Sequence, residues 1–162
     1  MKKTIILIIF LFTLQSTYSQ SNIIKANPLG IVFGIANAGY EKTINNNQSI
    51  TISGTYFKES IDEGDGDVNG FGADAKYNFY FSSSTEAPVG FHVGPGIGVL
   101  FLSDDKDDAT VVSFNALAGY QWVLWQSFAI DIFAQYDYIT DSNFSGVDSS
   151  YIGIGLSLGY AW

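Results

Sequence analysis

Large apolar residues alternate with small or polar residues along most of the chain. In the last twelve residues every second position is large and apolar, and the set is Ile152, Ile154, Leu156, Leu158, Tyr160 and Trp162. The positions between are glycine, serine or alanine. A period of two places such sets on opposite faces of a β-strand. Residues 151–162 are therefore predicted to form a strand with one apolar and one small face.

The same alternation recurs in five further segments: 49–58, 70–81, 89–102, 110–122 and 128–138. A soluble barrel would keep its large apolar residues inside and show water a charged outer face. The second face here is mostly glycine, serine, asparagine and glutamine, which suits a narrow interior better than a soluble exterior. The pattern therefore favours a transmembrane β-barrel with its apolar face in lipid, and a soluble barrel or sandwich is the alternative.

The strand lengths and connections agree with a membrane barrel. Twelve residues in a strand tilted by about 40° span roughly 30 Å, enough for the apolar band of an outer membrane. Short connections at 43–47, 82–88 and 123–127 alternate with longer or more acidic ones at 59–69, 103–109 and 139–150. Short turns face the periplasm in bacterial barrels. The acidic connections are therefore predicted to be outer loops, and they hold eleven of the 16 acidic residues.

The number of strands depends on residues 23–42. Six strands are clear, and a closed single-chain barrel takes an even number. The apolar phase is odd at Leu29, Ile31 and Phe33 but even at Ala38 and Tyr40, so it changes near residues 34–37. A tight hairpin there gives eight strands, and a bulge in one long strand would give the same change of phase. We predict the hairpin and an antiparallel up-and-down barrel of eight strands.

The first residues predict export. Lys2 and Lys3 precede an apolar run, and Thr17-Tyr18-Ser19 offers small residues for a signal peptidase, so residues 1–19 are predicted to be a signal peptide and 20–162 the barrel domain. Cysteine is absent, so no disulfide stabilises this small exported domain. The mature chain would keep five lysines and no arginine against 16 acidic residues. This charge excludes a nucleic-acid partner.

Four motifs carry a resemblance to a known group of proteins. They are NPLGIVFG at 27–34, GYEK at 39–42, GYQW at 119–122 and the terminal LGYAW at 158–162. With the signal peptide, they make the chain resemble small outer-membrane β-barrel proteins of Bacteroidota, which are similar in architecture to OmpX and the membrane domain of OmpA. The resemblance implies that Tyr160 and Trp162 belong to the terminal signal read by the barrel-assembly machinery. It assigns no chemistry.

Candidate metal and catalytic residues are few. Asp65, Asp67 and Asn69, followed by Gly70, match the opening of a calcium loop. The twelfth position is Lys76 instead of the bidentate glutamate, so we expect no specific calcium site and no cofactor. His92 is the only histidine. Its phase points it inward between glycines, where a structural role is favoured over a catalytic one.

Five charged residues have the inward phase: Glu41, Asp74, Lys76, Asp131 and Asp137. Charges inside a narrow barrel must be paired or hydrated, because an isolated buried ion costs several kcal/mol. Lys76 is the only clear cation among them. We expect a lumenal charge network that stabilises the barrel, and the alternative is a path for protons or a solute. Pro95 also lies in a predicted strand and is expected to mark a bulge.

Together these features predict a monomeric, non-catalytic scaffold in the bacterial outer membrane with acidic surface loops. Its expected partners are membrane lipid and lipopolysaccharide, the barrel-assembly machinery, and divalent cations or a basic partner at the loops. A narrow pore or small-solute channel is the alternative function, and a lipid-modifying barrel enzyme is the second alternative. Large inward side chains such as Tyr80 and Phe133 argue against an open pore.

Overall fold

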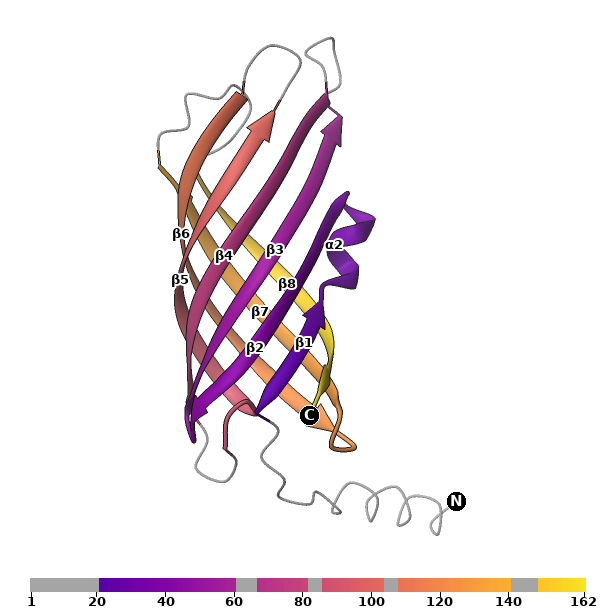
Figure 1. Cartoon of the computed structure of the whole chain (residues 1–162), viewed down its shortest axis with the longest axis vertical. Coiled ribbons are helices and arrows are strands. Elements are labelled where there is room, and N and C mark those ends of the chain that lie inside the picture. The colour runs from indigo at the N-terminus through magenta and orange to yellow at the C-terminus, as the bar shows by residue number, and fades with distance from the viewer. Residues whose placement is uncertain (1–20, 61–66, 82–85, 104–107, 141–148) are drawn as a thin grey trace.

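In the computed structural model, the chain forms a closed antiparallel barrel of eight strands in sequence order, with β1 pairing with β8 (Figure 1). The structure describes residues 21–60, 67–81, 86–103, 108–140 and 149–162. The elements are β1 (Asn22–Ala26), α2 (Pro28–Val32), β2 (Ile35–Asn45), β3 (Gln48–Ser60), β4 (Asp67–Phe81), β5 (Gly90–Ser103), β6 (Asp108–Leu124), β7 (Phe128–Ile139) and β8 (Ser150–Ala161). The predicted all-β barrel of eight strands is confirmed. The predicted signal peptide lies outside the described residues.

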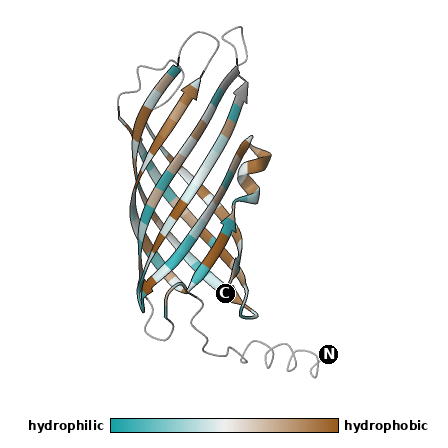
Figure 2. Ribbon diagram, in the orientation of Figure 1, coloured by the Kyte–Doolittle hydropathy of each residue, from teal (hydrophilic) through white to brown (hydrophobic). Residues whose placement is uncertain are grey.

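The two faces of the strands are arranged as the alternation predicts. Along β7, Ile132 and Tyr136 on the outer face are exposed, whereas Asp131 and Asp137 on the inner face are buried. Apolar and polar residues accordingly alternate along the strands in Figure 2. A soluble protein would bury its large apolar side chains, so this inverted pattern fits a barrel surrounded by lipid.

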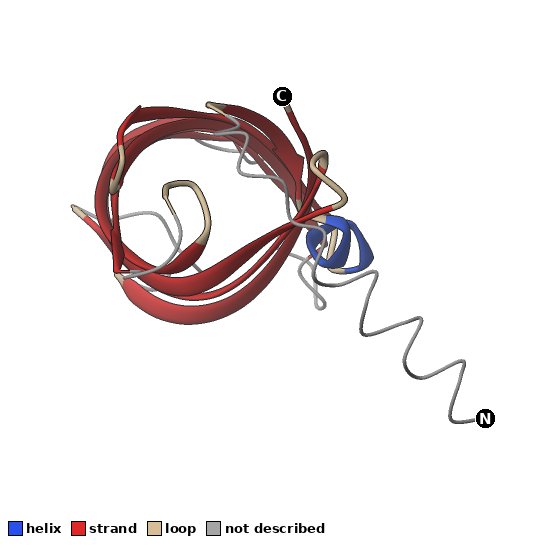
Figure 3. Ribbon diagram, turned by 90° about the horizontal axis from the view of Figure 1, so that it is seen from below, coloured by secondary structure: helices blue, strands red, loops and turns tan. Residues whose placement is uncertain are grey.

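Residues 23–42 form two strands, but the predicted hairpin at 34–37 is wrong. β1 ends at Ala26, and the short helix α2 leads to β2 at Ile35. Asn27 caps α2 by accepting a hydrogen bond from the Gly30 backbone nitrogen at 3.0 Å, and Pro28 stands at its first position. Gly34 ends the turn with a φ of 75°, a conformation that glycine adopts without strain. The helix lies outside the ring of strands (Figure 3).

Inner-face glycines make room for large side chains on neighbouring strands. A methyl group added at Gly155 would collide with the ring of Phe133, its register partner on β7. A methyl group at Gly70 would collide in the same way with Phe57 on β3. An eight-stranded barrel is just wide enough for side chains to fill. The glycines therefore allow a few large side chains to occupy the lumen.

Pro95 interrupts β5 without the expected bulge. The register between β4 and β5 is the same on both sides of it, as the pairs Lys76↔Gly96 and Phe79↔Val93 show. Pairing is lost only locally, because proline has no backbone N–H to donate.

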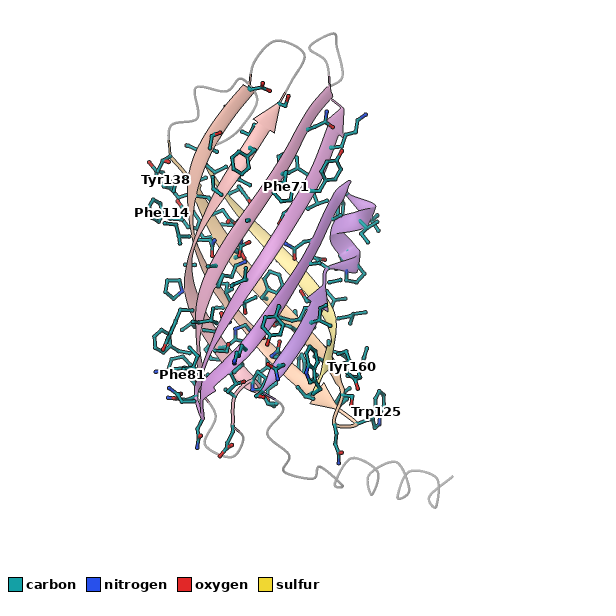
Figure 4. The ribbon with its side chains drawn as sticks, viewed as in Figure 1. Phe71, Phe81, Phe114, Trp125, Tyr138 and Tyr160 are labelled. Carbon is teal, nitrogen blue, oxygen red and sulfur yellow. The ribbon has the colours of Figure 1, made fainter. Side chains whose placement is uncertain are left out.

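Aromatic side chains gather at both ends of the apolar band. Phe71 and Tyr138 lie toward the end where β3 meets β4, and Phe81, Tyr160 and Trp125 lie toward the opposite end, near the chain terminus at Trp162 (Figure 4). Such girdles mark the two interfaces of a membrane with water. No helix in the described ranges is long and apolar enough to cross a membrane.

Candidate functional site in the barrel lumen

Lys25 is the centre of the charge network inside the barrel. It extends inward from β1, and its Nζ lies 2.8 Å from Glu41 Oε2 and 3.1 Å from Asp131 Oδ2. Glu41 is fully buried, and only 5% of the Asp131 side chain is exposed. The five charged residues predicted to face inward, of which Lys76 was the only clear cation, did not include Lys25. Lys25 has the same odd phase as Ile23, and that phase is the signal by which it could have been found.

Neutral side chains supply the remaining hydrogen bonds to Glu41. Ser49 and Tyr80 donate hydrogen bonds to Oε1, the latter at 2.6 Å. Gln121 donates to Oε2 at 3.2 Å and to the backbone oxygen of Pro88 at 2.6 Å. The last bond links the network to the connection before β5. Each carboxylate oxygen of Glu41 thus has a donor, as a buried charge requires.

His92 extends the network from β5. Its Nε2 lies 3.0 Å from Asp131 Oδ1, and its side chain is almost completely buried. The other ring nitrogen, Nδ1, is buried without a hydrogen-bond partner. The inward direction predicted for His92 agrees with its burial.

The other predicted lumenal charges form two separate groups. Lys76 Nζ lies 2.7 Å from Asp74 Oδ2, which also accepts a hydrogen bond from Ser53 at 2.8 Å. Asp137 accepts two hydrogen bonds from the amide of Gln135, at 2.8 and 2.9 Å. By direct ion pairs and hydrogen bonds the five predicted residues form three groups, and Asp137 also interacts electrostatically with Lys76 and Asp74.

A cavity of about 50 Å³ separates the Lys25 cluster from the Lys76 cluster. It is lined by polar side chains from seven strands, including Asn37, Asn78, His92, Gln135 and Ser157. One water molecule needs roughly 10–15 Å³ measured in this way, so the cavity has room for a few. Asn78 Oδ1 and His92 Nδ1, on two of the lining residues, are buried without hydrogen-bond partners.

Apolar side chains close the lumen on both sides of the polar layers. Ile23, Val123, Ala129 and Ala161 form a buried cluster near the β6–β7 turn, with Val89 packed against it. Ala87 and Pro88 beside them are also buried, so the connection before β5 lies in the mouth of the barrel. Leu102, Val111 and Ile139 form a second cluster toward the opposite end. The described side chains thus form an apolar cluster on each side of the polar layers.

The remaining predicted residues lie away from this network. Asp67 and Asn69 belong to β4, and Asp65 lies outside the described residues. No group of three His, Asp or Glu side chains in the described ranges is placed to hold a metal ion. Tyr160 and Trp162 stack with ring centroids 6.0 Å apart on the outer face, and Trp162 exchanges backbone hydrogen bonds with Asn22. Of the predicted acidic loops, most residues lie outside the described ranges.

Solved structures show what this fold is similar to. Neisserial surface protein A (NspA) matches with a TM-score of 0.59 and 17% identity over 87% of this chain and 92% of that one. The N-terminal β-barrel domain of OprF from Pseudomonas aeruginosa matches with a TM-score of 0.54 and 15% identity over 88% of this chain and 98% of that one. No family model and no curated protein matches the sequence. The chain therefore has the fold of small outer-membrane β-barrels, and the likeness shows the fold alone.

Proposed function

We propose that this protein is a non-catalytic scaffold of the bacterial outer membrane whose barrel, largely filled by side chains, displays acidic loops to the outside. The observation that carries the proposal is the inverted packing: apolar side chains cover the outside, and a paired polar network with apolar clusters fills the inside. Such a body is stable in a membrane without conducting or reacting. The likeness to outer-membrane barrels supports the location. The sequence motifs support membership of the small Bacteroidota barrels.

The acidic loops are the proposed working surface. The acidic residues expected there are Glu59, Asp62, Glu63, Asp65, Asp67, Asp104, Asp105, Asp107, Asp108, Asp141 and Asp148, with only Lys58 and Lys106 nearby. A dense negative surface repels anionic lipopolysaccharide unless divalent cations bridge the two. It attracts basic partners over a Debye length of about 8 Å at physiological ionic strength. Divalent cations and a basic protein or peptide are therefore the proposed ligands.

The test compares two sets of charge removal in the mature protein. Asp104, Asp105, Asp107 and Asp108 are replaced by asparagine in one variant, and Glu86, an exposed acid in the connection before β5, is replaced by glutamine in the control. Both variants should reach the outer membrane and keep different gel mobilities before and after boiling. The loop variant should bind calcium and an oligolysine peptide at least fivefold more weakly, whereas Glu86→Gln should not.

Equal binding of both probes by the wild type and the loop variant would contradict the role of the loops. Recovery of the wild type in the soluble periplasm would contradict the location itself. Conductance recordings test the alternative of a narrow pore. We expect no steady current, because eight strands leave an interior that side chains fill.

A further inference from the structure

The barrel closes by a seam that covers only part of the height of β8. β1 pairs with β8 in four register pairs, from Ile23↔Ala161 to Ala26↔Leu158, whereas β7 pairs with β8 in eleven. β1 then gives way to α2. Among the described residues, no strand pairs with 150–157 of β8 on the side that faces β1. The wall of the barrel is therefore interrupted above Leu158.

Side-chain exposure shows the interruption on both faces of β8. Ile152 and Ile154 on the outer face are 77% and 82% exposed, compared with 48% for Ile132 on the fully paired strand β7. On the inner face, a methyl group added at Gly153 would meet no atom within 4 Å. The corresponding methyl group at Gly155, two residues closer to the seam, would collide with Phe133. β8 is thus open around residues 152–154.

The interruption also leaves a polar edge at the depth of the apolar band. Asn22 and Trp162 exchange backbone hydrogen bonds of 3.2 and 3.0 Å, so even-numbered residues of β8 direct their N–H and C=O groups toward β1. By the same alternation, those groups of Ile152 and Ile154 point past the end of β1. Hydrocarbon does not tolerate an open strand edge unless protein covers it or it lines a water-filled cavity. This edge must therefore be covered by protein such as α2, which lies beside β8, or line a water-filled cavity.

The lumen cavity lies directly behind the interruption. Its lining includes Asn37 of β2 and Ser157 of β8, which stand on the two sides of the seam just above the last β1 pair. The cavity lining also includes Asp131 and Ser53, whose side chains carry oxygen atoms. These side chains offer hydrogen-bond acceptors to a polar group that enters from the seam.

Apolar side chains flank the same interruption on the outside. In α2 and the residue after it, Ile31, Val32 and Phe33 are 65%, 78% and 77% exposed. α2 lies beside both β2 and β8. Together with Ile152 and Ile154, they provide an apolar border on each side of a polar edge. This combination matches an amphiphile, with an alkyl chain outside and a polar head inside.

Charge decides which head group fits. The described lumenal charges are four carboxylates, Glu41, Asp74, Asp131 and Asp137, and two ammonium groups, Lys25 and Lys76. The surplus of carboxylates repels an anionic head and attracts a cationic one. The carboxylate of Asp131, which lines the cavity, can accept a hydrogen bond from an ammonium group.

We propose that the interruption between α2 and residues 152–157 of β8 is a lateral portal, through which a cationic single-chain amphiphile places its head in the lumen cavity. Its alkyl chain stays in the membrane against α2 and Ile154. The proposal rests on the membrane location argued above, and it adds a ligand site to a barrel that otherwise serves as a scaffold.

The absence of cysteine makes a site-specific test possible. Gln135, which lines the cavity and pairs in register with Gly153, is replaced by cysteine and labelled with bimane in barrels reconstituted in nanodiscs of neutral lipid. The probes are nitroxides carried on the head of a dodecyl ammonium, on the head of a dodecyl sulfonate and on a chainless ammonium. Bimane at Ile132→Cys, on the outer face of β7, reports ordinary membrane partitioning.

The dodecyl ammonium nitroxide should quench bimane at Gln135→Cys at a concentration at least fivefold below that of either other probe. At Ile132→Cys the two dodecyl nitroxides should quench to a similar extent. Adding Gly153→Phe, which fills the open side of β8, should reduce quenching at Gln135→Cys at least fivefold. Ala116→Phe on the exposed outer face of β6 is the matched control and should have no effect.

Three outcomes would overturn the proposal: equal quenching by cationic and anionic alkyl probes at Gln135→Cys, equal quenching by the chainless probe, or full quenching in a folded Gly153→Phe variant. If Gly153→Phe does not fold, the comparison of the three probes in the labelled Gln135→Cys protein that keeps Gly153 still tests the proposal. A protein that fails to enter nanodiscs would instead contradict the membrane location, so the two failures can be distinguished.

Discussion

Lys25 of β1 and Glu41 of β2 form an ion pair of 2.8 Å inside the barrel, and the glutamate is completely buried. The pair joins the shortest strand to its neighbour beside the seam, where β1 contributes only four register pairs to β8. Lys25 also pairs with Asp131 of β7 at 3.1 Å, so side-chain contacts across the seam add to the backbone ladder that closes the barrel. This makes the pair a sensitive point for stability.

Lys25→Met should destabilise the folded barrel by about 3–5 kcal/mol, because it leaves Glu41 and Asp131 buried without their shared cation. Combining it with Glu41→Leu should recover more than half of the loss. Lys42→Met is the control, since Lys42 is exposed on the outer phase, and it should change stability by less than about 0.5 kcal/mol. Urea unfolding, followed by gel mobility without boiling, measures all three. Equal midpoints for Lys25→Met and Lys42→Met would refute the importance of the pair.

Gly155→Leu should cost about 1–3 kcal/mol or prevent folding, because its side chain would occupy the space of the Phe133 ring. Gly153→Leu, two residues away on the same face, should cost much less, since a Cβ there meets open space. Adding Phe133→Ala to Gly155→Leu should restore most of the stability. The same urea assay applies. If the two glycine variants unfold at the same urea concentration, the packing of Phe133 on Gly155 does not matter.

Ile132→Arg should cost about 2–4 kcal/mol, because Ile132 lies on the outer face near the middle of β7 and would place a charge in the apolar band. Ile44→Arg should cost about 0–1 kcal/mol, since Ile44 is exposed near the end of β2, at the level of the interface. Unfolding from lipid vesicles measures the difference. Similar costs at the two depths would mean that this face does not contact a bilayer.

Trp162→Asp should lower the yield of folded protein in the outer membrane at least fivefold. The residue stacks on Tyr160, contacts the ring of Tyr40 across the seam and hydrogen-bonds with Asn22 through its backbone. It also belongs to the terminal motif that resembles an assembly signal. Trp125→Asp, an equally aromatic but strongly exposed turn position, should have a smaller effect. Quantitative blots of membrane fractions test this, and equal yields would argue against a role for Trp162 in assembly.

The sequence alone determined the class of fold, because the residues of a β-strand point alternately to its two faces. The composition of each face can therefore be read from every second residue. Six strands and the outward direction of residues such as Ile132 followed from that period. The inward direction of His92 and Asp131 followed from the same rule. Local capping signals were also present at Asn27, Pro28 and Gly34, and they could have placed α2 where a hairpin was expected. Because residues 27–34 were expected to be part of a strand, the inward direction of Lys25 was also missed.

Only the tertiary structure decided which residues meet across the barrel, because pairing in the lumen depends on register and shear, which a period of two does not contain. Lys25 reaches Glu41 on the neighbouring strand β2 and Asp131 on β7, and its pair with Asp131 exists only once β1 closes against β8. The large side chain that faces each inner glycine, as Phe133 faces Gly155, is likewise set by register. The interrupted seam has the same origin, since the shortness of β1 matters only where β8 continues beyond it.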